Sequence, residues 1–204
     1  MKTKRRCRWR SIAGLMALAV CTVGVRINAD QAAAPGSKPR AEDVAGFKEF
    51  TARVQAYITL QKAVTAGLPA LKSTDLPEMI TAYQQALARK IREARPKAKP
   101  GDIFTNKALE AFRHVSRALL EGPRTANSRG YAAPGGPNPG MRLAVNGLYP
   151  DTEPITPPSP ALLAVFPSLP VELAYRFVGR TLILIDVKSR LVVDFAQLVR
   201  PQTP

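Results

Sequence analysis

The chain has little of the chemistry on which most metal sites and nucleophilic enzymes depend. Its 204 residues include two cysteines, one histidine and one tryptophan, and both cysteines, Cys7 and Cys21, fall in the first 25 residues. The remainder therefore has no disulfide framework and no cysteine nucleophile. His114 is the only imidazole and no carboxylate–histidine cluster has ligand spacing, so we predict no metal site and no cofactor.

Motifs for covalent catalysis and phosphate binding are also missing. There is no Gly-x-Ser-x-Gly elbow, and Gly135-Gly136 lies among prolines rather than between a strand and a helix. Asp186 and Asp194 fall near the ends of neighbouring predicted strands and could serve glycoside hydrolysis at a suitable separation. Acids in such positions more often face solvent or pair with a nearby base. We therefore favour a non-enzymatic protein and predict no catalytic residue, with a hydrolase using Asp186, Asp194 or His114 as the alternative.

The N-terminus has the pattern of an export signal. Six basic residues between Lys2 and Arg10 precede the uncharged, largely apolar stretch Ser11–Val25. This stretch is short for a membrane span, which needs about 20 apolar residues. We expect residues 1–29 to be a signal peptide cleaved after Ala29, and the protein to be periplasmic or secreted. The alternatives are an uncleaved inner-membrane anchor and lipidation at Cys21, although a valine precedes that cysteine where a small residue is usual.

Charge is the most distinctive property of the part that would be exported. The full chain has a formal charge of +15, and the residues from Pro35 onward hold 23 basic and 14 acidic side chains, or +9. Such a surface can attract anions, so an anionic envelope component or another protein is a candidate partner, whereas the commoner case is a solvated basic surface that keeps the protein soluble. Export makes nucleic acid an unexpected partner. The basic run over residues 89–99 makes binding of an anionic envelope polymer an alternative function.

The sequence predicts an α+β fold: a small bundle of three helices, a linker and a C-terminal three-stranded antiparallel β-meander. After a flexible leader over residues 30–40, apolar residues recur at helical spacing through the helical region 41–122. The second helix begins near Asp75, where Asp75 and Glu78 can cap its first turn, and the third follows Thr105 as N-cap. The three apolar stripes are Phe47, Phe50, Val54, Tyr57, Ile58 and Val64; Met79, Ile80, Tyr83, Leu87 and Ile91; and Ala108, Phe112, Val115 and Leu119.

Breaker residues and alternation organise the rest of the chain. Residues 123–160 are rich in Pro and Gly and predict a linker, which contains one short strand near Leu143–Tyr149. Residues 161–200 predict the meander, with a helical turn at 161–166 that helps to cover it. The expected strands are Glu172–Val178, Thr181–Val187 and Arg190–Phe195, joined by turns at Gly179-Arg180 and Lys188-Ser189.

Two segments carry a family resemblance. Residues 91–96 (IREARP) with 101–105 (GDIFT), and the run 169–195 containing YRFVGR, LIL, DV and LVVDF, resemble an uncharacterised family of exported bacterial proteins. The resemblance covers most of residues 45–195 and implies the architecture, not a mechanism. A shorter likeness, over about 25 residues of the hairpin, is to small periplasmic proteins of the nickel/cobalt-homeostasis type. Since metal ligands are lacking, metal handling is not carried over.

Overall fold

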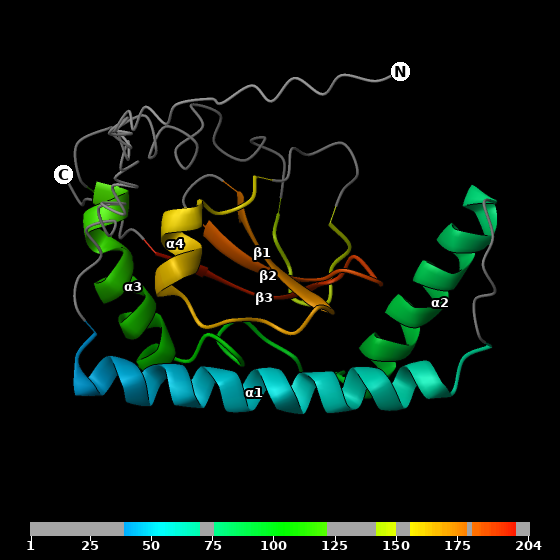
Figure 1. Ribbon diagram of the computed structural model, residues 1–204. Coiled ribbons are helices and arrows are strands. Elements are labelled where there is room, and N and C mark those ends of the chain that lie inside the picture. Colours follow the sequence, from blue (N-terminus) through cyan, green and yellow to red (C-terminus); the bar gives the residue numbers. More distant parts are fainter. Residues whose placement is uncertain (1–38, 70–75, 122–141, 150–155, 179–180, 199–204) are drawn as a thin grey trace, which may run out of the picture. The chain divides into compact units, whose positions relative to one another are not determined.

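The computed structural model describes residues 39–69, 76–121, 142–149, 156–178 and 181–198. In chain order the elements are α1 (Ala41–Ala66), α2 (Pro77–Ala94), α3 (Asn106–Glu121), α4 (Pro160–Val165), β1 (Leu173–Val178), β2 (Thr181–Asp186) and β3 (Val192–Gln197) (Figure 1). The predicted α+β class is confirmed, with helices first and a three-stranded antiparallel sheet at the C-terminus. The predicted signal peptide, the cleavage site at Ala29, Cys21 and most of the leader and linker lie outside the described residues. Among the described helices, none is both long and apolar enough to cross a bilayer.

A side-chain hydroxyl accepts a backbone N–H in the first turn of α3 and of α4, whereas the N-caps of α1 and α2 make no such bond. The hydroxyl of Thr105 accepts the N–H of Ala108 at 3.3 Å, which confirms Thr105 as the N-cap of α3. We predicted that α2 begins near Asp75. In the structure Leu76 is the N-cap and Pro77 is the first helical residue. Proline is favoured there because it has no N–H to satisfy and its φ is already helical. Asp75 lies outside the described residues.

The sheet has the order β1-β2-β3, with both pairs antiparallel. The predicted third strand, Arg190–Phe195, begins two residues later at Val192. The cause is the turn after β2, where Arg190 has a positive φ of 57° and donates its N–H to the Asp186 carbonyl at 2.9 Å. The turn therefore spans residues 187–190 rather than Lys188-Ser189 alone. A register shift between Leu184 and Ile185 leaves one extra β3 residue, Val193, without a partner on β2.

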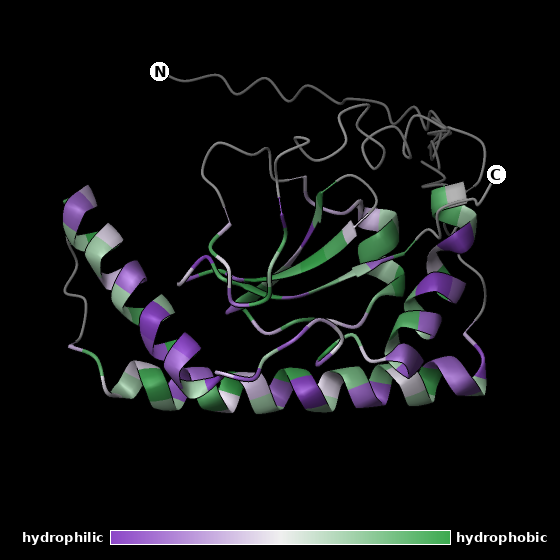
Figure 2. Cartoon of the chain, turned by 180° about the vertical axis from the view of Figure 1, so that it is seen from behind, coloured by the Kyte–Doolittle hydropathy of each residue, from purple (hydrophilic) through white to green (hydrophobic). Residues whose placement is uncertain are grey.

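Both faces of the sheet are buried. The face that carries Tyr175, Leu182 and Leu184 packs against α1, α3 and α4 in one continuous core, so the sheet and helices stabilise one another (Figure 1). The opposite face, which includes Ile183, packs against Tyr149 and the partly buried Leu143. Figure 2 shows the strands as predominantly hydrophobic, whereas the helices alternate between hydrophobic and hydrophilic positions. This pattern fits a sheet covered on both sides by amphipathic elements.

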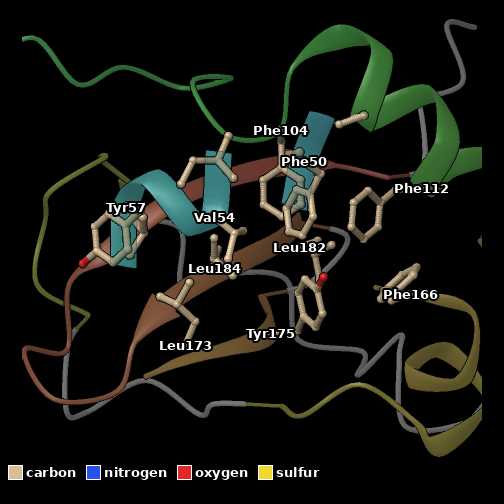
Figure 3. Packing of buried hydrophobic residues seen from close by; sticks show 14 of the residues in the cluster. Phe50, Val54, Tyr57, Phe104, Phe112, Phe166, Leu173, Tyr175, Leu182 and Leu184 are labelled. Atoms are coloured by element: carbon tan, nitrogen blue, oxygen red, sulfur yellow. The ribbon is translucent and has the colours of Figure 1, made fainter. Parts of the chain in front are cut away.

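Aromatic rings fill the centre of the main core (Figure 3). The Phe50 ring of α1 stacks on Phe104 at a centroid separation of 5.3 Å, and Phe112 of α3 meets Phe50 edge-on at 5.0 Å. Phe112 also contacts Phe166, just after α4, at 4.8 Å, and Tyr175 of β1 lies 5.5 Å from Phe166. Aromatic pairs of this kind add stability beyond the area that they bury.

The segment at residues 142–149 lines the edge of the sheet instead of forming the short strand that we predicted. It makes one isolated bridge, Leu148 to Leu191, and Asn146 donates its N–H to the Val192 carbonyl at 2.8 Å. Asn146 has a positive φ of 60°, which interrupts extended structure. Further along β3, the Gln197 carbonyl accepts two bonds from the Arg113 guanidinium, at 2.9 and 3.2 Å. These contacts cover an edge that would otherwise offer free backbone groups to another chain.

Candidate functional site

Asp194, the first of the two candidate catalytic carboxylates, is fully buried and fully engaged. Its Oδ2 accepts the backbone N–H groups of Ile103 and Phe104 at 2.7 and 2.8 Å. Its Oδ1 accepts those of Gly101 at 3.0 Å and Phe195 at 2.8 Å. Four fixed donors thus hold one carboxylate, which ties the loop before α3 to β3. This geometry is that of a structural anchor.

Asp186 is also fully buried, against our expectation that both acids would face solvent or pair with a nearby base. One oxygen accepts the hydroxyl of Tyr57 at 2.8 Å, and the other accepts the N–H of Ser189 at 2.7 Å. The first bond joins α1 to the sheet, and the second shapes the turn after β2. Burial raises the pKa of Tyr57, and the neighbouring carboxylate raises it further, so Tyr57 stays a hydroxyl donor.

His114, the only histidine, contacts another helix. Its Nδ1 lies 2.7 Å from Oδ2 of Asp43 on α1, and its side chain is 22% exposed. Asp43 also accepts the backbone N–H of Arg40 at 2.7 Å, and the Arg40 guanidinium lies 3.4 Å away. Burial would raise the pKa of Asp43, but the hydrogen bonds from Arg40 and His114 outweigh it and leave that pKa below its ordinary value. The trio therefore joins the start of α1 to α3.

The run at residues 89–99 contains six basic side chains, of which Lys90 pairs with Glu93 at 2.9 Å. Arg92 and Arg95 bind Asn146, through its carbonyl at 2.9 Å and its side-chain oxygen at 3.2 Å, and Arg95 also lies over the Tyr57 ring at 5.1 Å. Arg89, Lys97 and Lys99 are exposed, and none of their side chains has an ion-pair partner within the described ranges. The run is therefore partly structural and partly a free basic surface.

A hollow lies between the C-terminal end of α1, the N-terminal half of α2 and the β2–β3 turn. It has a volume of about 590 Å³ and is lined by Thr65, Ala66, Leu68, Ile80, Tyr83, Gln84 and Lys188. Its surface is mostly apolar. Ligand sites for small molecules are typically about 300–1,000 Å³, apolar, and equipped with a few polar groups, so this pocket has the size and character of one.

The half of α2 that lines the pocket also carries exposed apolar side chains. The apolar stripe of α2 is buried only in its second half, at Leu87 and Ile91. In the first half, Met79 is 48% exposed and Ile80 is 37% exposed, and Leu76 just before the helix is 56% exposed. Figure 1 shows this half of α2 extending beyond the contact with α1. Periodicity predicted the stripe but not the pocket, because the lining comes from three segments that are distant in sequence.

No three His, Cys, Asp or Glu side chains in the described parts of the chain converge to hold a metal ion. The chain matches no protein-family model, no curated protein and no solved structure. The resemblance of residues 91–105 and 169–195 to an exported family thus stays a hypothesis, and function has to be argued from the geometry alone.

Proposed function

We propose that this chain is an exported, non-enzymatic binding protein, and that its ligand occupies the pocket between α1, α2 and the β2–β3 turn. The observation that carries the proposal is the apolar pocket of about 590 Å³, whose lining includes Ile80, an apolar side chain that the fold leaves 37% exposed. Such side chains gain free energy when a ligand covers them, about 25 cal/mol for each Å² removed from water.

The polar groups that enzymes commonly use are engaged elsewhere. Asp186 and Asp194 accept hydrogen bonds from donors that belong to the fold, two and four respectively, and neither lines the pocket. His114 binds Asp43 at the α1–α3 contact. The hydrolase hypothesis built on Asp186, Asp194 and His114 therefore gains no support, whereas a binding role needs only the pocket.

The test is titration of a neutral apolar dye, N-phenyl-1-naphthylamine, into the purified protein, with fluorescence as the readout. The substitution Ile80→Glu removes apolar surface from the lining and introduces a hydrated carboxylate, so it should weaken dye binding by about tenfold or more. Thr81→Glu is the matched control, since Thr81 is exposed on the same helix and does not line the pocket. It should leave the affinity unchanged. Absence of dye binding, or equal affinities for the parent and both variants with unchanged circular dichroism, would refute the proposal.

A second candidate function is binding of an anionic envelope polymer by Arg89, Lys97 and Lys99. It is favoured by their exposure and by their lack of ion-pair partners within the described ranges. Binding to vesicles of anionic lipid should then weaken steeply between about 0.05 and 0.5 M salt. Replacing the three residues by glutamine should abolish it, whereas Lys107→Gln on α3 should not. Salt-insensitive binding, or none, would exclude this function.

A further inference from the structure

We infer that the pocket selects a single-chain amphiphile with an anionic head group, and that Lys188 is the residue that determines this specificity. The inference rests on the proposed function and names its ligand class. It follows from the charge at the mouth of the pocket, from the anchoring of the turn that carries Lys188, and from the apolar character of the lining.

Lys188 is the only charged side chain among the residues that line the pocket. Neither of the acidic residues nearest to it along the chain forms an ion pair with it. Asp186 is buried and bound to Tyr57 and Ser189, and Glu172 lies 3.8 Å from the Lys62 ammonium. Lys188 has no ion pair within the part of the chain that the structure describes. The pocket therefore presents one positive charge that is not held in a salt bridge within the described residues, which favours an anion over a neutral or cationic head group.

The turn that carries Lys188 is firmly held. Asp186 accepts the N–H of Ser189 at 2.7 Å through its side chain and that of Arg190 at 2.9 Å through its carbonyl. Val187 donates its N–H to the Glu172 carbonyl at 2.9 Å. Ser189 is fully buried while Lys188 is exposed. The backbone below Lys188 is thus fixed before a ligand arrives, which reduces the entropy lost on binding.

The rest of the lining suits a hydrocarbon chain with one additional polar contact. Ala66, Leu68, Ile80 and Tyr83 provide the apolar surface, and Gln84 provides an amide with no hydrogen-bond partner within the described ranges. The Thr65 hydroxyl is already donated to the Gln61 carbonyl at 2.7 Å. A head group at Lys188 could therefore also accept a bond from Gln84 while its chain covers the apolar surface. Carboxylate and phosphate head groups share the required chemistry.

The experiment is displacement of the neutral dye by three ten-carbon ligands, each below its micelle concentration: decanoate, decanol and decylammonium. In the parent protein, decanoate should bind about three- to tenfold more tightly than decanol, and decylammonium most weakly. The preference should shrink in about 0.5 M salt, as expected for a partly exposed charge. In Lys188→Met, which keeps a long flexible side chain, decanoate and decanol should bind equally, with decanol affinity unchanged. Lys107→Met on α3, outside the pocket, should keep the preference.

The outcomes separate the two proposals. Equal displacement by all three ligands in the parent would overturn the anion inference and leave the binding function standing. Loss of the preference in both lysine variants would overturn it too, since general positive charge would then explain the result. Failure of every ligand and of the dye would overturn both proposals. A dimer that forms through this surface, seen as a concentration-dependent sedimentation coefficient reversed by Ile80→Glu, would also overturn the inference.

Discussion

Replacing Asp194 by asparagine tests the interpretation of this carboxylate as a structural anchor. The side chain keeps its shape but loses its charge, and one acceptor oxygen becomes an NH₂ group. Because two backbone N–H groups bind each carboxylate oxygen, any amide orientation turns the NH₂ toward two donors. The favoured orientation keeps the oxygen toward Ile103 and Phe104, whose N–H groups are buried, and sacrifices the bonds from Gly101 and Phe195.

The size of the effect follows from the bonds that are lost. Hydrogen bonds to a charged group contribute about 1.5–3 kcal/mol each, so losing two costs about 3–6 kcal/mol. This is a large part of a typical unfolding free energy of about 5–15 kcal/mol. The measurement is urea unfolding followed by circular dichroism, with the free energy extrapolated to zero denaturant. Amide hydrogen exchange at Gly101 should also quicken.

Asp102→Asn is the matched control because Asp102 lies in the same loop. Its carboxylate accepts one exposed bond, from the Lys99 N–H at 3.0 Å. An exposed bond of this kind contributes about 1 kcal/mol or less. The reasoning would be refuted if Asp194→Asn destabilised the protein by no more than Asp102→Asn. It would also be refuted if Asp194→Asn abolished an enzymatic activity while the unfolding free energy stayed at the parent value.

Two further predictions concern the contact between α1 and α3. In Gly46→Ala the new Cβ would lie 2.6 Å from the Lys107 carbonyl oxygen, so the helices must separate. We expect a net loss of about 1–2 kcal/mol in urea unfolding, as overpacking outweighs the gain in helix propensity. Gly67→Ala, with only a 3.5 Å contact, should change little, and equal effects would contradict this account. Because folding lowers the pKa of Asp43, its ionised carboxylate stabilises the folded protein at pH values above the pKa of about 4 that it has in the unfolded chain. This stabilisation is lost as the pH falls through the lower pKa that Asp43 has in the folded protein. Asp43→Asn should therefore be less stable than the parent near pH 6 but should lose less stability between about pH 5 and 2. The measurement is the urea midpoint of both proteins as a function of pH. An equal fall of the two midpoints across that range would contradict the prediction.

Short-range sequence patterns predicted most of the secondary structure. The stripe from Phe50 to Ile58 predicted α1, and the apolar run Thr181–Asp186 predicted the central strand, because period and side-chain type act over a few residues. Thr105 was recognisable as an N-cap for the same reason. Two errors fell at the ends of elements: α2 begins at Pro77 and β3 at Val192, because of a proline and a positive φ at Arg190. A third was the strand predicted near Leu143–Tyr149, which makes only an isolated bridge.

The roles of the polar residues depended on contacts that no local pattern encodes. Asp194 binds Ile103 across 91 residues, Asp186 binds Tyr57 across 129, and His114 binds Asp43 across 71. Whether such an acid is a solvent-facing group, a catalyst or an anchor depends on the donors that the fold brings to it. The sequence made these acids candidates for catalysis, and the hydrogen bonds that surround them in the fold show a structural role.

The sequence by itself determined the fold class, the helical and strand segments, and the scarcity of histidine and cysteine, since these are properties of composition and short-range pattern. Only the tertiary structure decided that the apolar stripe of α2 is half buried and half exposed, and that Lys188 comes to lie with Ile80 and Thr65 around one pocket. The physical reason is that burial depends on which surfaces meet. The stripe has the same period along its whole length, but α1 covers only one end of it.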